Sequence, residues 1–129
     1  MTDLASAVQR AVYDALVGGV TLAAVHQHVP EGTPPPVVII GEGDFSEEGG
    51  KGERLERHEV MVLTVVRGPG KLPLRAVQEQ VRAALHDRPL TAAGASLSSP
   101  SIVSTSDQLL EDGETYAGTQ QFVIWAEPA

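Results

Sequence analysis

The sequence predicts an α+β domain in which two helices pack on one face of a mostly antiparallel sheet, in the order α-β-β-β-α-β-β. Two segments repeat apolar residues at the three- and four-residue spacing of a helix face. The segments between and after them alternate in the way that strands do. The length of 129 residues fits a single domain over residues 1–129, whose core needs neither a metal nor disulfides.

The first helix is expected over residues 4–16. Either Thr2 or Asp3 can cap its start, and Gly18 with Gly19 ends it. The next segment, 20–29, allows two interpretations: TLAAV could extend a helix, but the alternation before a proline favours a short strand. The apolar face of the helix comprises Leu4, Val8, Ala11, Val12, Ala15 and Leu16.

Two strands with a long connection follow. Three prolines at 34–36 hold the chain extended into VVII, a β-branched run that we expect to form a buried strand ending at Gly41. Residues 42–57 are rich in glycine and mixed charge, which predicts a flexible charged loop or hairpin tip. Residues 57–67 form the clearest strand of the chain.

The second helix is expected from Pro73 to about Asp87, because proline suits the first turn of a helix. Two weaker strands are expected over residues 95–106 and 116–127. Pro100 interrupts the first of them, which indicates an irregular strand or a sheet edge. The buried stripe of the helix comprises Leu74, Val77, Val81, Ala84 and Leu85.

The strands are apolar on both faces. Along 60–66 and 122–125 successive residues point to opposite sides, and neither side is polar. Two helices can cover only one face, that of Val60, Val62, Thr64, Val66, Phe122 and Ile124. We therefore expect oligomerisation through a subunit interface formed by Met61, Leu63, Val65, Val123 and Trp125. The alternative is a closed, sandwich-like monomer in which both faces are internal.

Composition excludes several classes of function. The absence of cysteine excludes disulfides, thiolate zinc sites and cysteine nucleophiles. A formal net charge of −8 opposes tight binding of DNA or RNA. No apolar run approaches the roughly 18 residues of a membrane helix. The first residues lack the basic start and apolar run of a signal peptide, so we expect a protein made and used in the cytoplasm.

Groups that could carry chemistry are few. His26 and His28 would point the same way from a strand, which is the minimum geometry for two metal ligands, but no third ligand lies close in sequence. We therefore predict no catalytic residue, no metal, no cofactor and no enzymatic activity. The remaining candidates match no catalytic or phosphate-binding motif: the serines between 96 and 106, Gly41–Gly43, Gly49–Gly52, and the acidic pairs Glu47–Glu48 and Glu111–Asp112.

The ordered segments resemble the small tail-completion or tail-terminator proteins of long-tailed phages and phage-like particles. The resemblance covers most of the chain and departs from the pattern at Val37, where similar proteins often carry an aromatic residue, and in the acidic loop. It rests on the AVYDAL helix, HQHVP with a proline-rich lead into VVIIGE, Arg57-His58-Glu59 opening an apolar strand, VQEQVRAAL followed by residues 87–90, and a closing strand before Glu127.

The resemblance implies a virion protein that forms a closed ring, expected to be a hexamer, at the head-proximal end of the tail tube. Such a ring would stop tube growth and offer a surface for joining the head. The implied partners are further copies of the chain, the tail tube protein and a head connector or adaptor protein. DNA would pass through the ring without specific binding, and the protein would reside in the virion tail after assembly in the host cytoplasm.

The charged connection is expected to form a mobile arm that orders on assembly, at the lumen or against the next ring. Its residues are Phe45, Glu47, Glu48, Lys51, Glu53 and Arg54. Two other functions stay open. One is a head-side connector or adaptor, which would also form a ring. The other is a small-ligand-binding or enzymatic α+β domain, for which His26, His28 and His58 are the candidate groups.

Overall fold

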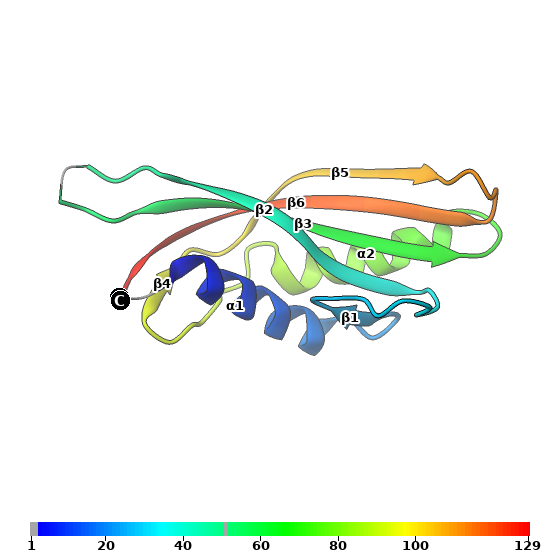
Figure 1. Cartoon of the computed structure of the whole chain (residues 1–129), viewed down its shortest axis with the longest axis horizontal. Coiled ribbons are helices and arrows are strands. Elements are labelled where there is room, and N and C mark those ends of the chain that lie inside the picture. The colour runs from blue at the N-terminus through cyan, green and yellow to red at the C-terminus, as the bar shows by residue number, and fades with distance from the viewer. Residues whose placement is uncertain (1–2, 51) are drawn as a thin grey trace.

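The computed structural model of the chain describes residues 3–50 and 52–129. Both helices lie on one side of the sheet, and the other side carries none (Figure 1). This confirms the predicted α+β class and element order, with the irregular strand expected over 95–106 divided at Pro100 into two strands. The elements are α1 (Leu4–Gly19), β1 (Ala24–His26), β2 (Val37–Glu47), β3 (Glu56–Arg67), α2 (Leu72–Leu85), β4 (Ala95–Leu97), β5 (Ser101–Leu109) and β6 (Thr115–Pro128).

The sheet is built around the long antiparallel pair β3 and β6, which stay in register from Glu56↔Ala126 to Arg67↔Thr115. The strand order is β1-β2-β3-β6-β4, and β5 also pairs with β6. β5 and β4 follow one another along the same outer side of β6. All pairings are antiparallel except that of β1 with β2.

The stripe predicted for the first helix forms the core with one row of the sheet. Asp3 caps the start of α1: its Oδ1 accepts from the backbone N–H of Ser6 at 3.1 Å, and its Oδ2 accepts from the Ser6 hydroxyl at 2.6 Å. These hydrogen bonds from Ser6 lower the pKa of Asp3. Ala15 is only half-buried, and Thr2 lies outside the described residues. The buried helix residues are Leu4, Val8, Ala11, Val12 and Leu16, opposite Val38, Ile40, Val60, Val62, Thr64, Phe122 and Ile124.

α2 buries a glutamine within its apolar stripe, which the spacing of apolar residues did not indicate. The side-chain Nε2 of Gln78 donates to the backbone carbonyl oxygen of Ser106. The backbone carbonyl oxygen of Gln78 accepts from Gln120 Nε2 at 3.0 Å. A Cβ at Gly118 would displace the Gln78 amide and lie 3.0 Å from the carbonyl oxygen of Ser106, so glycine here leaves room for the Gln78 contact. The remaining buried residues are the predicted Leu74, Val77, Val81 and Leu85.

The two helices meet where α1 ends. Gly19 approaches Ala84 so closely that a Cβ added at Gly19 would lie 2.7 Å from the Cβ of Ala84. Gln80 then holds the chain beyond the helix: its Oε1 accepts from the N–H groups of Thr21 and Leu22 at 2.9 and 3.0 Å. TLAAV therefore does not extend the helix, and the expected short strand forms as β1.

The turn between β5 and β6 is closed by an aspartate. Asp112 accepts the hydroxyl of Thr115 at 2.5 Å and the backbone N–H groups of Glu114 and Thr115. These hydrogen bonds, that of the Thr115 hydroxyl first, lower the pKa of Asp112 to about 2. Gly113 adopts a φ of +72°, which glycine allows without strain. The acidic pair Glu111–Asp112 thus belongs to a structural turn.

Substituting alanine at the two adjacent glycines of α1 should have opposite effects on stability. Gly19→Ala would place a methyl group against Ala84 and should lower the free energy of unfolding by about 1–3 kcal/mol. Gly18→Ala meets nothing within 4 Å and should raise it by about 0.5–1 kcal/mol, because glycine loses more conformational freedom on folding. Urea denaturation measures both, and equal effects would contradict the close helix contact.

Candidate functional site

The face of the sheet opposite the helices carries the predicted interface residues. The register of β3 with β6 places Met61, Leu63 and Val65 on this face, with Val123 opposite Glu59 and Trp125 opposite Arg57. Met61 is 42% and Trp125 38% exposed, whereas Leu63 and Val65 are half-buried and Val123 is buried. The sequence therefore grouped these residues correctly on one face, and whether they form an interface stays a prediction.

The apolar strip on this face is wider than the sequence indicated. β2 places Val37 beside Val65 and Ile39 beside Leu63. Both residues belong to the run VVII, which was expected to form a buried strand, and Val37 is buried while Ile39 is half-buried. Its alternation could have revealed them, since every second residue of a strand faces the same way.

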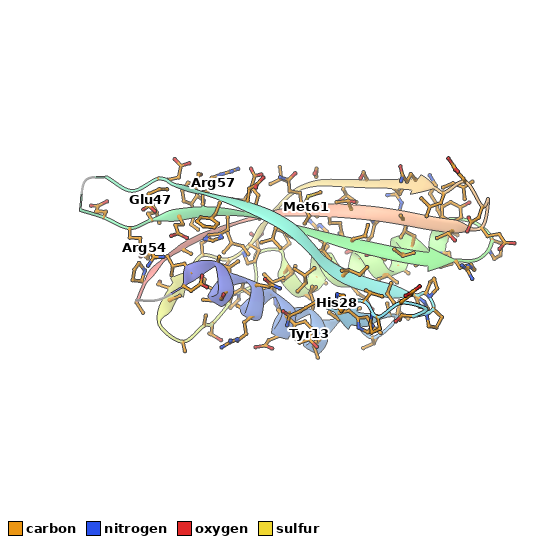
Figure 2. All side chains as sticks on the ribbon, in the orientation of Figure 1. Tyr13, His28, Glu47, Arg54, Arg57 and Met61 are labelled. Atoms are coloured by element: carbon orange, nitrogen blue, oxygen red, sulfur yellow. The ribbon has the colours of Figure 1, made fainter. Side chains whose placement is uncertain are left out.

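Between Met61 and Trp125 this face is polar, and the charges of Arg57 and Glu59 there are paired with each other. Arg57 Nη1 pairs with Glu59 Oε1 at 2.6 Å, and Gln121 Nε2 donates to Glu59 Oε2 at 3.1 Å. Arg57 and Met61 lie on the helix-free side, whereas Arg54 lies on the side toward α1 (Figure 2). An approaching surface would therefore meet apolar side chains, the Arg57–Glu59 pair and the exposed carboxylate of Asp44 beside it.

The second candidate surface is the β2–β3 hairpin, which projects beyond the start of α1 (Figure 1). The strand expected to end at Gly41 instead continues to Glu47, so the connection between strands spans only residues 48–55. The physical reason is an irregularity in register between Ile40 and Gly43. A Cβ at Gly43 would collide with the carbonyl oxygen of Glu59, so glycine here permits the strand to continue.

The residues predicted for the assembly loop do not form one cluster. Phe45, 56% exposed, stacks on the ring of His58 with centroids 4.8 Å apart. Glu47 lies in β2 and accepts from the backbone N–H of Leu55 at 3.2 Å. Glu48 accepts from the Ser46 hydroxyl, the backbone N–H of Glu53 donates to Gly50, and Lys51 lies outside the described residues.

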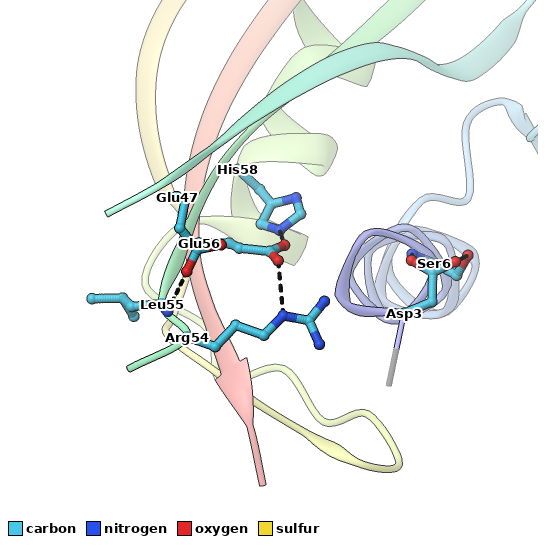
Figure 3. Close-up of polar contacts among 7 residues, drawn as sticks. All are labelled: Asp3, Ser6, Glu47, Arg54, Leu55, Glu56 and His58. Carbon is cyan, nitrogen blue, oxygen red and sulfur yellow. Dashed lines mark hydrogen bonds and ion pairs between the residues drawn. The ribbon is translucent and has the colours of Figure 1, made fainter. Parts of the chain in front are cut away.

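Arg54 turns back toward the root of the hairpin and joins a buried carboxylate. Its Nε donates to Glu56 Oε2 at 3.1 Å, and His58 Nε2 lies 2.9 Å from Glu56 Oε1. A carboxylate can only accept, so His58 carries its hydrogen on Nε2. Glu56 is 3% and His58 4% exposed. Arg54 lies between Glu56 and the first turn of α1, near Asp3 (Figure 3).

This network of Arg54, Glu56 and His58 was missed in the sequence, where the segment reads as a charged opening to an apolar strand. The signal was present in the alternation of RLERHE, which puts Glu56 and His58 on the same face of a strand. Their face is that of Val60, the helix side. The network fixes the root of the hairpin rather than offering a reactive group to solvent.

The two histidines that were weighed as metal ligands are separated by the end of a strand. His26 closes β1, and His28 follows beyond it. Among the described residues, no three His, Asp or Glu side chains gather closely enough to hold a metal ion. Of the same residues, none belongs to a helix long and apolar enough to cross a membrane.

Comparison with known proteins points to one family. The sequence model of the family described as "Tail completion protein gp17" matches residues 4–127. No curated protein matches the chain. Among solved structures, a chain from "Virion of native gene transfer agent (GTA) particle" is 22% identical in sequence. It superposes with a TM-score of 0.88 and covers 98% of this chain and 99% of that chain, which establishes a shared fold.

Removing the buried carboxylate should be costlier than removing its exposed counterpart on the same strand. Glu56→Ala leaves His58 and Arg54 without their acceptor and should lower the free energy of unfolding by about 3 kcal/mol. Glu59→Ala breaks a pair whose side chains are each about one-third exposed and should cost about 1 kcal/mol or less. Chemical denaturation measures both free energies of unfolding. A loss for Glu56→Ala no larger than that for Glu59→Ala would contradict the anchoring role of the network.

Proposed function

The chain belongs to the tail completion protein gp17 family, and we propose that it acts as the terminator of a phage-type tail. It is a structural protein of such a tail. In this proposal several copies, expected to be six, form a closed ring on the head-proximal end of the tail tube. The ring stops polymerisation of the tube protein and presents its other side to the head connector or adaptor. Assembly takes place in the host cytoplasm.

The observation that carries the proposal is the apolar sheet face without helices. Met61 and Trp125 remain more than one-third exposed there, beside the half-buried Leu63 and Val65. The apolar row of Met61, Leu63 and Val65, with Trp125 separated from it by Arg57 and Glu59, is the kind of partly exposed apolar surface that marks an interaction site. A neighbouring copy that covers it through a different surface of its own makes a heterologous contact, and such contacts close into rings.

A ring of this type needs no catalysis to stop growth. Heterologous contacts give it two unlike sides, so one side can match the end of the tube and the other cannot accept further tube subunits. We therefore propose a role without enzymatic activity or cofactor. The net charge of −8 suits a channel for DNA, because acidic walls do not bind a polyanion.

The projecting hairpin is proposed as the arm that makes contact beyond the ring. Support comes from the exposed Phe45 and from the acidic residues Glu47, Glu48 and Glu53 around the tip. The root is held by buried Glu56, so the arm would leave the body at a fixed position while the tip orders on assembly, at the lumen or against the next ring.

A lysine on the helix-free face should prevent ring formation without unfolding the chain. We expect the wild type to show the mass of a ring in light scattering and an open centre in electron micrographs. Met61→Lys places a charge where a neighbour would exclude water and should weaken assembly at least tenfold. Leu22→Lys, at a residue 52% exposed outside this face, should assemble normally. Equal assembly of the two variants would contradict the interface.

Reversing the charge of the hairpin tip should separate ring formation from joining. Glu48→Lys with Glu53→Lys leaves the buried root intact, so folding and ring mass should not change. Joining of tails to heads, counted in electron micrographs of assembling particles, should fall several-fold. The matched control carries Glu79→Lys and Glu111→Lys, two exposed acidic residues away from the hairpin. Normal joining by the tip variant would show that the arm makes no such contact.

A further inference from the structure

β5 forms an open edge of the sheet. Over its nine residues, Ser101–Leu109, it pairs only with β6 among the described strands. Most of its residues are exposed, including Val103 at 57% and Leu109 at 52%. Figure 1 shows α2 beneath the sheet and no element on the outer side of β5. The backbone groups of an edge strand can pair with another chain.

Of the features with which proteins usually prevent such pairing, this edge has one, an irregularity in register between Ile102 and Ser104 near its start. Residues 101–109 contain no proline and no lysine. Their one charge, Asp107, is held by Lys71 Nζ at 3.0 Å and Arg75 Nη2 at 2.6 Å. Only the start is covered, where the N–H of Ile102 donates to His86 Nδ1 at 3.1 Å. The open stretch is therefore 103–109.

A second open edge lies on the opposite side of the same sheet. β1 pairs with β2 only at residues 37–39. From Ile40 to Glu47, β2 has β3 on one side and no described strand on the other. The two open stretches, 40–47 and 103–109, are of similar length and lie on different strands of one sheet. One stretch of a copy can therefore pair through its backbone with the other stretch of a neighbouring copy.

We propose that β5 of one copy pairs with residues 40–47 of β2 in the next copy, so that one sheet continues through neighbouring subunits. The strands β2, β3, β6 and β5 alternate in direction. A neighbour related by rotation about an axis along the strands therefore presents β2 antiparallel to β5. The contact is heterologous, as closure of a ring requires, and the inference rests on the proposed ring.

Charge favours the same neighbour. Antiparallel pairing places the hairpin end of the incoming β2 toward the start of β5, where α2 ends, because Asp87 N donates to Pro100 O at 2.9 Å. Arg82 and Arg88 are exposed near this end of α2, and no ion pair joins them to another described side chain. The incoming Glu47 would complement them.

The chain contains no cysteine, so introduced cysteines can report the contact directly. Ser104, opposite Gln121, and Asp44 and Ser46, opposite Glu59 and Arg57, all point to the helix-free face. Two double variants carry Ser104→Cys with either Asp44→Cys or Ser46→Cys. On mild oxidation at least one of them should give a ladder of covalent multimers ending at the ring mass on a denaturing gel.

The controls separate the possible outcomes. Ser104→Cys with the exposed Glu79→Cys on α2 should give no ladder. The absence of a ladder from both edge variants, or rapid dimerisation of Ser104→Cys alone through paired β5 strands, would overturn the edge contact. If light scattering nevertheless shows a ring, the proposed terminator role stands without this contact. If no ring forms either, both inferences fail.

A charge on the edge provides an independent test. Val103→Lys should reduce the assembled fraction at a fixed concentration at least fivefold, because lysine on an edge strand opposes pairing. Val17→Lys, at a valine of similar exposure (51% against 57%) on α1, is the matched control and should assemble like the wild type. Both variants should keep the wild-type melting temperature within about 2 °C. Equal assembly of folded Val103→Lys and the control would contradict the proposal.

Discussion

The constraint on which the structure depends is that two helices cover one face of a sheet whose central strands are apolar on both. β3 and β6 run side by side over their whole lengths, and their helix-side row forms the core with α1 and α2. The same strands cannot avoid presenting a second row to the other side. A small chain thus reaches a stable core and leaves a second apolar row on the face without helices.

Polar groups inside this core fix contacts between elements that apolar residues could not specify. Gln78 joins α2 to the backbone of β5 and to Gln120 of β6, and Glu56 joins Arg54 and His58 at the root of the hairpin. Buried hydrogen-bonded groups of this kind fix how elements meet, because their partners must be in place. Apolar packing fixes the positions of the two helices, whereas these hydrogen-bonded contacts fix the positions of the edge strand β5 and of the β2–β3 hairpin.

The features that follow from the spacing of apolar residues along the sequence were predicted well. The stripes of both helices, the two rows of β3 and the break at Pro100 are all local patterns and were located correctly. Gly43 misled because a glycine among charges resembles a loop, while only the partner strand shows that it belongs to a bulge. Gln78 and Glu56 were missed for the same reason: burial of a polar side chain depends on acceptors and donors distant in sequence. Which strand ends at an open edge is likewise a property of the whole sheet.

Because the root of the β2–β3 hairpin is anchored, the position of the hairpin on the body does not depend on the length of its tip. Glu48 and Leu55 close the paired part of the hairpin through a backbone hydrogen bond of 2.8 Å. Glu56 lies below that point, and Arg54, one residue beyond it, pairs back to Glu56. Residues nearer the tip than Arg54 can be added or removed without removing a partner of the buried carboxylate. Because each doubling of a flexible loop costs only about 0.6 kcal/mol of closure entropy, the reach of the tip can change among related chains while the body stays the same. The fold thus allows tips of different length on one unchanged body.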